Sequence, residues 1–468
     1  MNPLPKLISK TKLMRGYQCL KSIYLSIHHK ELETAVSVDQ QFQFDQSHFV
    51  SMTARTYFPG GILIDNKPWD FFGALKKTRE LLAQKTELIY EAAFEYKGCY
   101  ARADIIKYNP GTQRWIIYEI KSSAKIKDEH LADTGLQAWI MANSGLPIEQ
   151  INIMHLNPIN KFPKTADLFL TIDVTEQLRK LYPSIAPKMT NVFSVLNDTE
   201  IPEISTGEHC KKPNPCSFID YCSKNKKGSE LNYNQFKSIE IQKRIQNCDQ
   251  AQSRFVDSQK IKSELAKWQY PLVFLDFETI NPAIPKYNGT SPYQQVPYQF
   301  SIHILNSADA EIIHHEYLHT DSTDPRDQLI PRLLKACGGK GSIVAYYAKF
   351  ESDRITEMAE YSEHYKNDLI KLLPRMVDPL PIIRDHIYDH QFKGSFSLKS
   401  VAPALLGEEY TYNNLTINNG LASQRAFVEM IDLNTTADRK LELIKASLEY
   451  CKQDTFVLYK LVQWMEKV

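Results

Sequence analysis

The sequence predicts an α/β protein with two domains joined by a helical connector, and three segments carry that prediction. Residues 91–121 alternate between apolar and polar side chains around two tight turns, which is typical of a β-meander. A second, continuously apolar strand pattern begins at residue 271. Between these two, residues 210–222 gather three cysteines that would close a first domain. We therefore expect domains at 1–226 and 270–468 and a connector at 227–269, within the roughly two to four domains that 468 residues allow.

The composition is that of an ordinary globular protein, with 43% hydrophobic and 24% charged residues. The net charge of +1 gives no overall basic signal, so a nucleic-acid surface would have to be a local patch. No apolar run approaches the ~18–20 residues of a membrane span, and the basic residues within positions 1–30 surround no long apolar core. Eight scattered cysteines do not resemble a secreted disulfide framework. We expect a cytoplasmic protein in a reducing compartment, without a membrane segment.

The first domain is expected to begin with a helix over residues 5–35 that carries Cys19. A turn at 58–61 leads into a short strand, and a second helix follows it. The meander then has three strands, and a further helix comes after the third. In chain order these expected elements are the strand 62–64, the helix 69–85, the strands 91–96, 99–107 and 113–121, and the helix 127–143.

Acidic and basic side chains gather at one end of this meander. Glu119 and Lys121 are two residues apart on a strand and so point to the same face, and Asp104 lies at the corresponding end of the preceding strand. Two carboxylates and a lysine are what metal-dependent phosphodiester cleavage needs, because carboxylates bind Mg²⁺ or Mn²⁺ and the lysine offsets charge on the phosphate. Gln137, on the following helix, could brace the site. The alternative is a surface ion pair worth under ~1 kcal/mol.

Three cysteines in one loop-like segment form the second signal. Cys210, Cys216 and Cys222 have five residues between neighbours, and two prolines between the first pair forbid a regular helix there. Thiolates gathered this closely usually share a metal or a cluster, and Cys19 is the best candidate for a fourth ligand. The alternative is a structural zinc site, but zinc sites favour closer C-x2–4-C pairs. The wide spacing favours an iron–sulfur cluster.

Together these residues resemble the iron–sulfur branch of the RecB-like nucleases in the PD-(D/E)xK superfamily, which have a restriction-endonuclease-like fold. The resemblance implies a 4Fe–4S cluster held by one cysteine before the nuclease core and three after it. It also implies catalytic roles for the triad and for the glutamine, and adds Glu91 as a further metal ligand. The residues that match are Cys19, Glu91, Asp104, Glu119, Lys121, Gln137, Cys210, Cys216 and Cys222. Relatives often carry a metal-binding histidine early in the domain, where the best register here places Ser51, with His48 nearby.

The second domain begins with the apolar strand 271–279, which ends in Asp276 and Glu278 on one face. Further strands are expected at 298–305, 311–319 and 342–347, and a helix begins near residues 350–353. In the C-terminal helix, Tyr450 and Asp454 are four residues apart and therefore share a face. The alternative is that Asp276 and Glu278 are merely carboxylates at a strand end.

This order of elements resembles the DnaQ-like 3′–5′ exonucleases, which have an RNase-H-like fold. The resemblance implies carboxylates around two Mg²⁺ or Mn²⁺ ions, with a tyrosine on the attacking water. The matching residues are Asp276, Glu278, Glu351, Tyr450 and Asp454. Relatives usually show Asn and Asp where this chain has Tyr347 and Glu351, so we take Glu351 as the third carboxylate, with Asp353 as the fallback. Asp378 resembles a structural aspartate that follows this motif.

The pairing of the two patterns resembles a family of bacterial proteins whose C-terminal domain has no assigned function, and residues 297–301 are among its recurring segments. We expect a metal-dependent nuclease that acts on single-stranded or end-bearing DNA in repair, recombination or defence. Tyr287, Tyr293 and Phe277 are candidates for stacking on bases near the second site. The alternatives are an RNA exonuclease and an end-binding scaffold with one or both sites degenerate.

Overall fold

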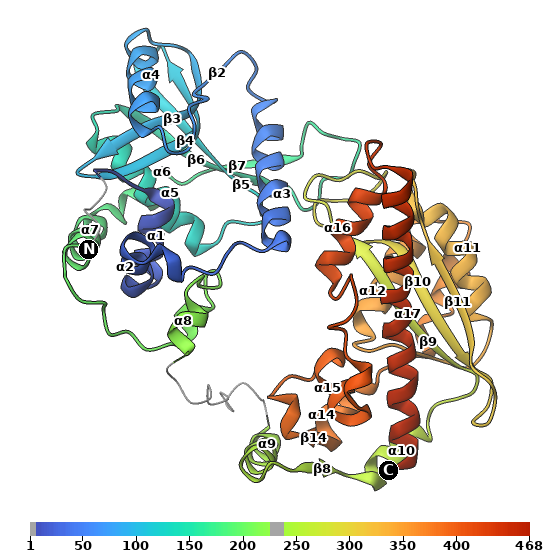
Figure 1. Cartoon of the computed structure of the whole chain (residues 1–468). Coiled ribbons are helices and arrows are strands. Elements are labelled where there is room, and N and C mark those ends of the chain that lie inside the picture. The colour runs from blue at the N-terminus through green and yellow to red at the C-terminus, as the bar shows by residue number, and fades with distance from the viewer. Residues whose placement is uncertain (1–5, 225–237) are drawn as a thin grey trace. The chain divides into compact units, whose positions relative to one another are not determined.

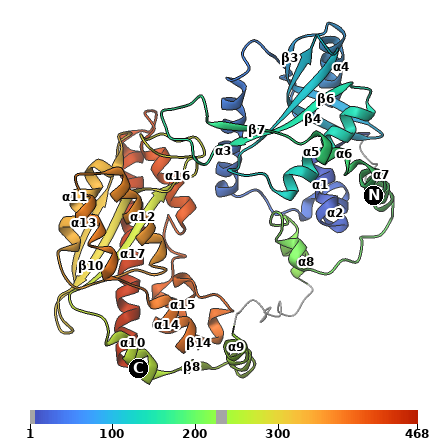
Figure 2. The same cartoon turned by 180° about the vertical axis from the view of Figure 1, so that it is seen from behind.

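The computed structural model describes residues 6–224 and 238–468. The described residues fall into two compact units, one within Met1–Ser229 and Pro282–Tyr293 and the other within Glu230–Asn281 and Gln294–Val468. Each unit has a mixed β-sheet with helices packed on it (Figure 1; Figure 2). The predicted α/β class is confirmed. Within the described residues, no helix has both the length and the hydropathy to cross a membrane.

The first unit is built on a seven-stranded sheet in the order β2-β3-β4-β5-β6-β7, with β1 paired to β4. The expected meander is β3-β4-β5, which is antiparallel throughout. Strand β6 lies parallel to β5, because the helix α5 (Asp128–Asn143) crosses over between them. The strands are β1 (Ile8–Ser9), β2 (Ile62–Leu63), β3 (Leu88–Tyr96), β4 (Cys99–Asn109), β5 (Arg114–Lys121), β6 (Ile148–Leu156) and β7 (Phe169–Asp173).

The helix expected over residues 5–35 is in fact two helices, α1 (Lys10–Gln18) and α2 (Leu20–His28). Cys19 separates them, because its backbone is extended with a φ of −162° while its N–H still caps α1. At this break Cys19 lines a cavity together with Cys210, Cys216 and Cys222. The remaining helices of the unit are α3 (Val38–Arg55), α4 (Phe71–Ala83), α6 (Thr175–Arg179), α7 (Tyr182–Leu196) and α8 (Ile219–Ser223).

Residues 282–293, which follow the first strand of the second unit in the chain, pack in the first unit. Ala283 lies in a buried cluster with Tyr90 and Ile105, and Tyr293 packs against that cluster. The main chain of Phe162 accepts from Gly289 at 2.9 Å. Tyr287 was predicted to stack on bases, but it is only 6% exposed, so that prediction is wrong. For Tyr293 base stacking stays a prediction.

The second unit has a five-stranded sheet in the order β11-β10-β9-β12-β13. Its first three strands in the chain pair antiparallel, and β12 then joins β9 and β13 in parallel. The order is set by hydrophobicity, since β9 is apolar on both faces and therefore lies in the middle of the sheet. The strands are β9 (Leu272–Ile280), β10 (Val296–Leu305), β11 (Ile313–Leu318), β12 (Ser342–Val344) and β13 (Met376–Val377).

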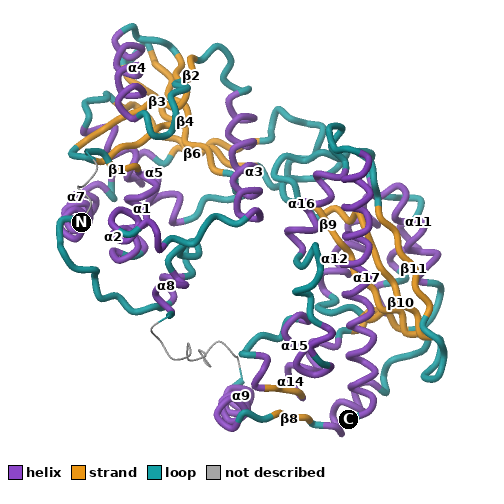
Figure 3. The backbone as a smooth tube through the Cα atoms, in the orientation of Figure 1, coloured by secondary structure: helices purple, strands orange, loops and turns teal. Residues whose placement is uncertain are grey.

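Alternation along β9 separates two cores. Val273 and Leu275 pack with residues of α11 and α12, whereas Phe274 packs with residues of α17, on the other face. The course of these helices along the sheet can be followed in Figure 3. Phe277, a predicted stacking residue, is only 4% exposed in the first of these cores, so that prediction is also wrong. The helices of the unit are α9 (Ile239–Ala251), α10 (Ser258–Leu265), α11 (Pro325–Cys337), α12 (Lys349–Tyr361), α13 (Lys366–Ile370), α14 (Pro379–His386), α15 (Leu398–Leu406), α16 (Gly420–Met430) and α17 (Ala437–Lys467).

The region expected as a helical connector differs from the prediction. It holds α9 and α10, but also the strand β8 (Arg254–Val256), which pairs with β14 (Ile387–Asp389). Residues 225–237 of the predicted connector lie outside the described residues. Ile245 and Ile261 are fully buried against Ile383 and Leu461, so α9 and α10 are part of the core of the second unit.

Candidate functional site

The acidic cluster of the second unit lies between β9 and α17. Asp276 and Glu278 follow Phe274 at a spacing of two, so they continue the face of β9 that meets α17. Asp454 of α17 completes the group, and one carboxylate oxygen from each of the three residues lies within 4.8 Å of the other two. The thiol of Cys451 is 3.7 Å from Oδ2 of Asp276. Three predicted ligands are thus brought together.

The cluster carries more negative charge than its surroundings offset. Burial raises the pKa of Asp276 well above its usual range, and the charges of Asp454, Glu278 and Glu351 raise it further. Burial, with the Asp454 charge, raises the pKa of Glu278 to about 8. Burial likewise raises the pKa of Asp454 to about 6, although hydroxyl groups and an ammonium group beside it act in the opposite direction. A divalent cation bound to these oxygens would supply the missing charge.

Glu351, the predicted third carboxylate, lies beside the three clustered residues but outside their 4.8 Å group. It is 3% exposed, and its Oε2 has no hydrogen-bond partner. Burial raises the pKa of Glu351 to about 8. An unpaired buried carboxylate oxygen at this place fits a cation ligand. The fallback residue, Asp353, is bonded instead to Lys349 at 2.5 Å on the helix surface.

Asp378 has the structural position that its motif suggested. Its carboxylate accepts hydrogen bonds from the backbone N–H groups of Tyr347, Ala348 and Leu380 at 3.1, 3.0 and 2.9 Å. The last of these caps the start of α14. With three backbone donors, Asp378 holds the turn before Glu351 in place.

Tyr450 lies on the same helix face as Asp454 and is 4% exposed. Its hydroxyl oxygen accepts a hydrogen bond from Nζ of Lys399 at 2.9 Å. Tyr412 packs edge-on against it, with ring centroids 6.2 Å apart. The hydroxyls of Tyr412 and Tyr450 and the Lys399 ammonium all act on Asp454. No spacing in the sequence singles out Lys399 or Tyr412, which lie in α15 and in the loop after it.

In the first unit, Glu119 is the centre of a buried ion-pair network. Its Oε1 accepts from Nζ of Lys121 at 2.9 Å and from Nζ of Lys10 at 3.0 Å. Its Oε2 accepts from Nε2 of Gln137 at 2.5 Å. Burial acts to raise the pKa of Glu119, but the two ammonium groups outweigh it and hold that pKa below its usual value. Lys10 and Asp133, the other acid in the network, were not predicted.

Asp104 and Glu91 face this network from the neighbouring strands. The β3–β4 ladder pairs Tyr90 with Ile105 and then Ala92 with Ala103. Glu91 and Asp104 lie between these pairs and have no partner in the ladder, which is an irregularity in the strand pairing. Burial raises the pKa of Asp104 well above its usual range, and the charges of Glu119 and Glu91 act in the same direction.

Glu91 itself has a φ of +57°, a strained conformation for a residue with a side chain, and pairs with Arg55. Burial raises the pKa of Glu91 above its usual value. His48, on α3, lies near enough to act in the opposite direction, but its effect is smaller. Ser51, at the position where the resemblance to RecB-like nucleases led us to expect a histidine, is on the same helix. The four predicted residues Glu91, Asp104, Glu119 and Lys121 therefore meet at one place, with Lys10 and Arg55 as additional cations.

The four predicted cysteine ligands line a single small cavity. Cys19 enters it from the break between α1 and α2, and the other three come from residues 210–222. Nε2 of His209 is 3.5 Å from Sγ of Cys210. Nε2 of Gln18 ties this loop to α1, because it donates to the carbonyls of His209 and Asn214, both at 2.7 Å. Burial raises the pKa of Cys19. All eight cysteines are free thiols.

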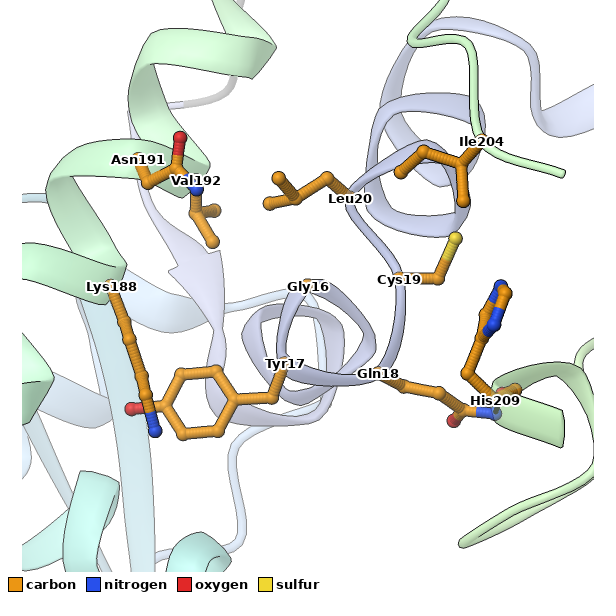
Figure 4. A pocket seen from close by; sticks show the side chains of 10 residues that line it. All are labelled: Gly16, Tyr17, Gln18, Cys19, Leu20, Lys188, Asn191, Val192, Ile204 and His209. Carbon is orange, nitrogen blue, oxygen red and sulfur yellow. Dashed lines mark hydrogen bonds between the residues drawn. The ribbon is translucent and has the colours of Figure 1, made fainter. Parts of the chain in front are cut away.

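Two kinds of metal site use four cysteine thiolates. A zinc ion binds them in a tetrahedron with Zn–S bonds of ~2.3 Å, and a 4Fe–4S cluster is held by four cysteines as well. Four soft thiol donors that line one cavity suit either group. A neighbouring cavity of about 420 Å³ is lined by Tyr17 and Lys188, with Cys19 beside Ile204 and His209 at its edge (Figure 4).

Comparison with known proteins gives a partial family match. Residues 273–397 match the model of a family described as "Domain of unknown function (DUF2779)". The chain contains a DUF2779 domain. That segment includes Asp276, Glu278, Glu351 and Asp378 but ends before Lys399 and α17. It also includes residues 297–301, so the predicted resemblance to a family without assigned function is confirmed to this extent.

Two distant relatives come from mollicutes. "Uncharacterized protein UU173" of Ureaplasma parvum is 25% identical over 224 residues, which cover 43% of this chain and 32% of the relative. "Uncharacterized protein MG366 homolog" of Mycoplasma pneumoniae is 23% identical over 216 residues, which cover 42% of this chain and 32% of the relative. The matches thus span about a third of the length of these relatives.

Proposed function

We propose that the protein is a metal-dependent nuclease whose second unit trims nucleic acid from the 3′ end. The observation that carries this proposal is the approach of Asp276, Glu278 and Asp454 within 4.8 Å of one another, with Tyr450 beside them. Carboxylates at this spacing are suited to Mg²⁺ or Mn²⁺, which are hard cations that bind oxygen ligands. When bound, such ions lower the pKa of the attacking water and stabilise the negative charge on the leaving 3′ oxygen.

The topology of the second unit supports an RNase-H-like fold. Three antiparallel strands in chain order are followed by two strands that join in parallel beside the first, and the first strand carries the leading acids. The last acid comes from the C-terminal helix that packs on this strand. This is the arrangement that the resemblance to DnaQ-like exonucleases requires.

The residues of this site have two different roles, which are binding of cations by carboxylates and binding of water by a tyrosine. Asp276, Glu278 and Asp454 hold negative charge at fixed positions, and Glu351 offers a further carboxylate oxygen at their side. Tyr450 presents a hydroxyl group to the same space and can hold a water molecule by a hydrogen bond. Because these side chains are buried, bulk water is excluded and their electrostatic effects are strong.

The first unit supports a second nuclease site of the PD-(D/E)xK kind. A helix, an antiparallel three-stranded meander, a crossover helix and a parallel strand are the core that this resemblance requires. Asp104, Glu119 and Lys121 sit at one end of that meander. We further propose that Cys19, Cys210, Cys216 and Cys222 hold a 4Fe–4S cluster that fastens residues 210–222 to α1 and α2.

The test is a digestion panel with full-length protein and MnCl₂ or MgCl₂. The substrates are 5′-labelled and 3′-labelled single-stranded and double-stranded DNA and RNA. Wild-type protein should shorten 5′-labelled single strands stepwise, and EDTA should stop it. Asp276→Asn should reduce this trimming by at least about 100-fold, whereas Asp368→Asn, at an exposed aspartate in the same unit, should leave it unchanged.

Trimming that survives Asp276→Asn, or a wild-type protein that binds ends without cleaving, would reject the exonuclease proposal. We favour DNA over RNA as the substrate, and preference for RNA in the panel would identify an RNA exonuclease instead.

A further inference from the structure

Lys399 is the one described cation whose ammonium group contacts the proposed tyrosine. It lies in the first turn of α15, which packs against α17. Its Nζ donates to the hydroxyl oxygen of Tyr450 at 2.9 Å and to the carbonyl oxygen of Asn418 at 2.6 Å. The same nitrogen is 4.8 Å from the ring centre of Tyr450 and 5.0 Å from that of Tyr412. Two acceptors and two ring faces therefore hold the ammonium group in one place.

The direction of this hydrogen bond is fixed by chemistry. An ammonium group has three donors and no acceptor, so the Tyr450 oxygen must be the acceptor. The Tyr450 O–H can then not point at Lys399 and is turned to the other side of the oxygen. The charges of Asp454 and Glu278 act on Tyr450, so both carboxylates lie near its hydroxyl group. A phenol without such a partner would be free to rotate its O–H.

We propose that Lys399 is a positioning residue that acts through Tyr450, holding the phenol and directing its O–H toward the space beside Asp454 and Glu278 where the attacking water is bound. This inference rests on the proposed exonuclease function of the second unit. A hydrogen-bond donor placed in advance does not have to be ordered during the reaction, which is why its loss lowers the rate of the chemical step.

A different role for Lys399 is simple charge balance, because its charge also acts on Glu278 and Asp454. The two roles differ in what a substitution changes. Charge balance predicts an altered affinity for the divalent cation, whether or not Tyr450 has a hydroxyl group. Positioning through Tyr450 predicts a lower kcat at unchanged metal affinity, and only while the hydroxyl is present.

The experiment measures kcat, KM and the Mn²⁺ concentration for half-maximal activity on a 5′-labelled single-stranded DNA oligonucleotide. Full-length wild type is compared with Lys399→Met, Lys399→Arg, Tyr450→Phe and the double variant Lys399→Met/Tyr450→Phe. Lys445→Met, an exposed lysine on α17, is the matched control. Thermal denaturation of each variant shows whether it is folded.

We expect Lys399→Met to lower kcat by about 10- to 100-fold, the effect of losing a charged hydrogen bond, with KM and the Mn²⁺ requirement changed less than twofold. Lys399→Arg should recover most of the kcat, and Lys399→Met should add less than twofold to the loss in Tyr450→Phe. Three results would overturn the inference. The losses of the two single variants could multiply in the double variant, the Mn²⁺ requirement could shift in Lys399→Met, or Lys399→Arg could be as impaired as Lys399→Met. Wild-type trimming that Asp276→Asn does not affect would instead overturn the proposed function.

Discussion

Lys10 and Lys121 bind the same two carboxylate oxygens. Both ammonium groups contact Oε1 of Glu119, at 3.0 and 2.9 Å, and both contact Oδ2 of Asp133, at 2.9 and 2.5 Å. The two lysines are 111 positions apart in the sequence, on α1 and at the end of β5. Two cations and two acids at this spacing form a neutral buried group, and removal of one member leaves the others uncompensated.

The first prediction follows from this network. Lys10→Met should lower the stability of the full-length protein by about 3–5 kcal/mol, because it leaves a buried carboxylate without one of its partners. Thermal denaturation measures the loss. Lys125→Met, an exposed lysine in the same unit, should change the melting temperature little. An equal melting temperature for Lys10→Met and wild type would show that the network contributes nothing to stability.

The second prediction concerns pH and divalent cations. In the metal-free protein the pKa values of Glu278 and Glu351 are raised from 4.5 to about 8, so the folded state keeps protons that the unfolded chain has already released. The contribution of these groups to stability is therefore fully present below about pH 4.5 and is lost as the pH rises to about 8. The loss is at most about 1.4 kcal/mol per pH unit for each such group.

Thermal denaturation in EDTA and in MnCl₂, at pH 6 and at pH 8, tests this. The stabilisation by Mn²⁺ should be larger at pH 8, because the cation then replaces the missing protons. Glu278→Gln should reduce the pH dependence seen in EDTA. A Mn²⁺ effect equal at both pH values would contradict the raised pKa values.

The third prediction is about a backbone position. Gly341 has a φ of +82°, and a Cβ at this residue would come within 2.0 Å of the carbonyl oxygen of Pro271. Gly341→Ala should therefore destabilise the second unit by about 2 kcal/mol or more. Gly339→Ala is the matched control, since a Cβ there meets nothing within 4 Å. Similar denaturation curves for the two variants would show that the strand start can move to accommodate the methyl group.

Local patterns predicted the framework of both units because the chemistry that shapes them is local. The turn at Lys97-Gly98 and the alternation around it gave the meander, and the apolar run before Asp276 gave the central strand β9. The break at Cys19 could not be predicted, since nothing in the sequence distinguishes it from a residue inside one helix. Likewise, β8 is only three residues long and forms because β14, more than 100 residues later, pairs with it.

The charged partners at the sites were missed for a related reason. Glu119 and Lys121 share a strand, so their spacing shows that they face the same way. Lys10 reaches Glu119 only because β1 pairs with β4 and places the start of α1 beside the meander. Lys399 reaches Tyr450 only because α15 packs against α17. Such contacts are made by tertiary packing and leave no periodic signal in the sequence.

The fourth prediction tests the cysteine cavity. Protein purified without oxygen should be brown, absorb broadly in the visible range and contain iron and sulfide. Cys216→Ser should remove iron and reduce solubility, because the cluster would no longer fasten residues 210–222 to α1 and α2. Cys248→Ser, a thiol in the second unit, is the control and should leave the iron content unchanged. Stoichiometric zinc without iron would contradict the cluster.

The fifth prediction is that the two proposed nuclease sites act independently. Each set of residues is complete within its own unit, since Glu91 to Gln137 belong to the first and Asp276 to Asp454 to the second. Asp276→Ala or Asp454→Ala should lower 3′ trimming by at least about 100-fold and leave the iron content unchanged. Lys121→Ala should abolish the cleavage by the proposed site of the first unit and leave 3′ trimming by the second unit intact. The assay uses 5′-labelled and 3′-labelled DNA in parallel, so that the two activities give different product ladders.

Two outcomes would reject this independence. If Lys121→Ala and Asp276→Ala each eliminate all cleavage, the two activities depend on one another. If neither variant affects cleavage, the observed activity comes from another source. We expect the larger loss from the variants in the second unit, because its three clustered acids are already within 4.8 Å of one another. In the first unit, Glu119 is bound by two lysines, and Ser51 occupies the position where the resemblance to RecB-like nucleases led us to expect a histidine.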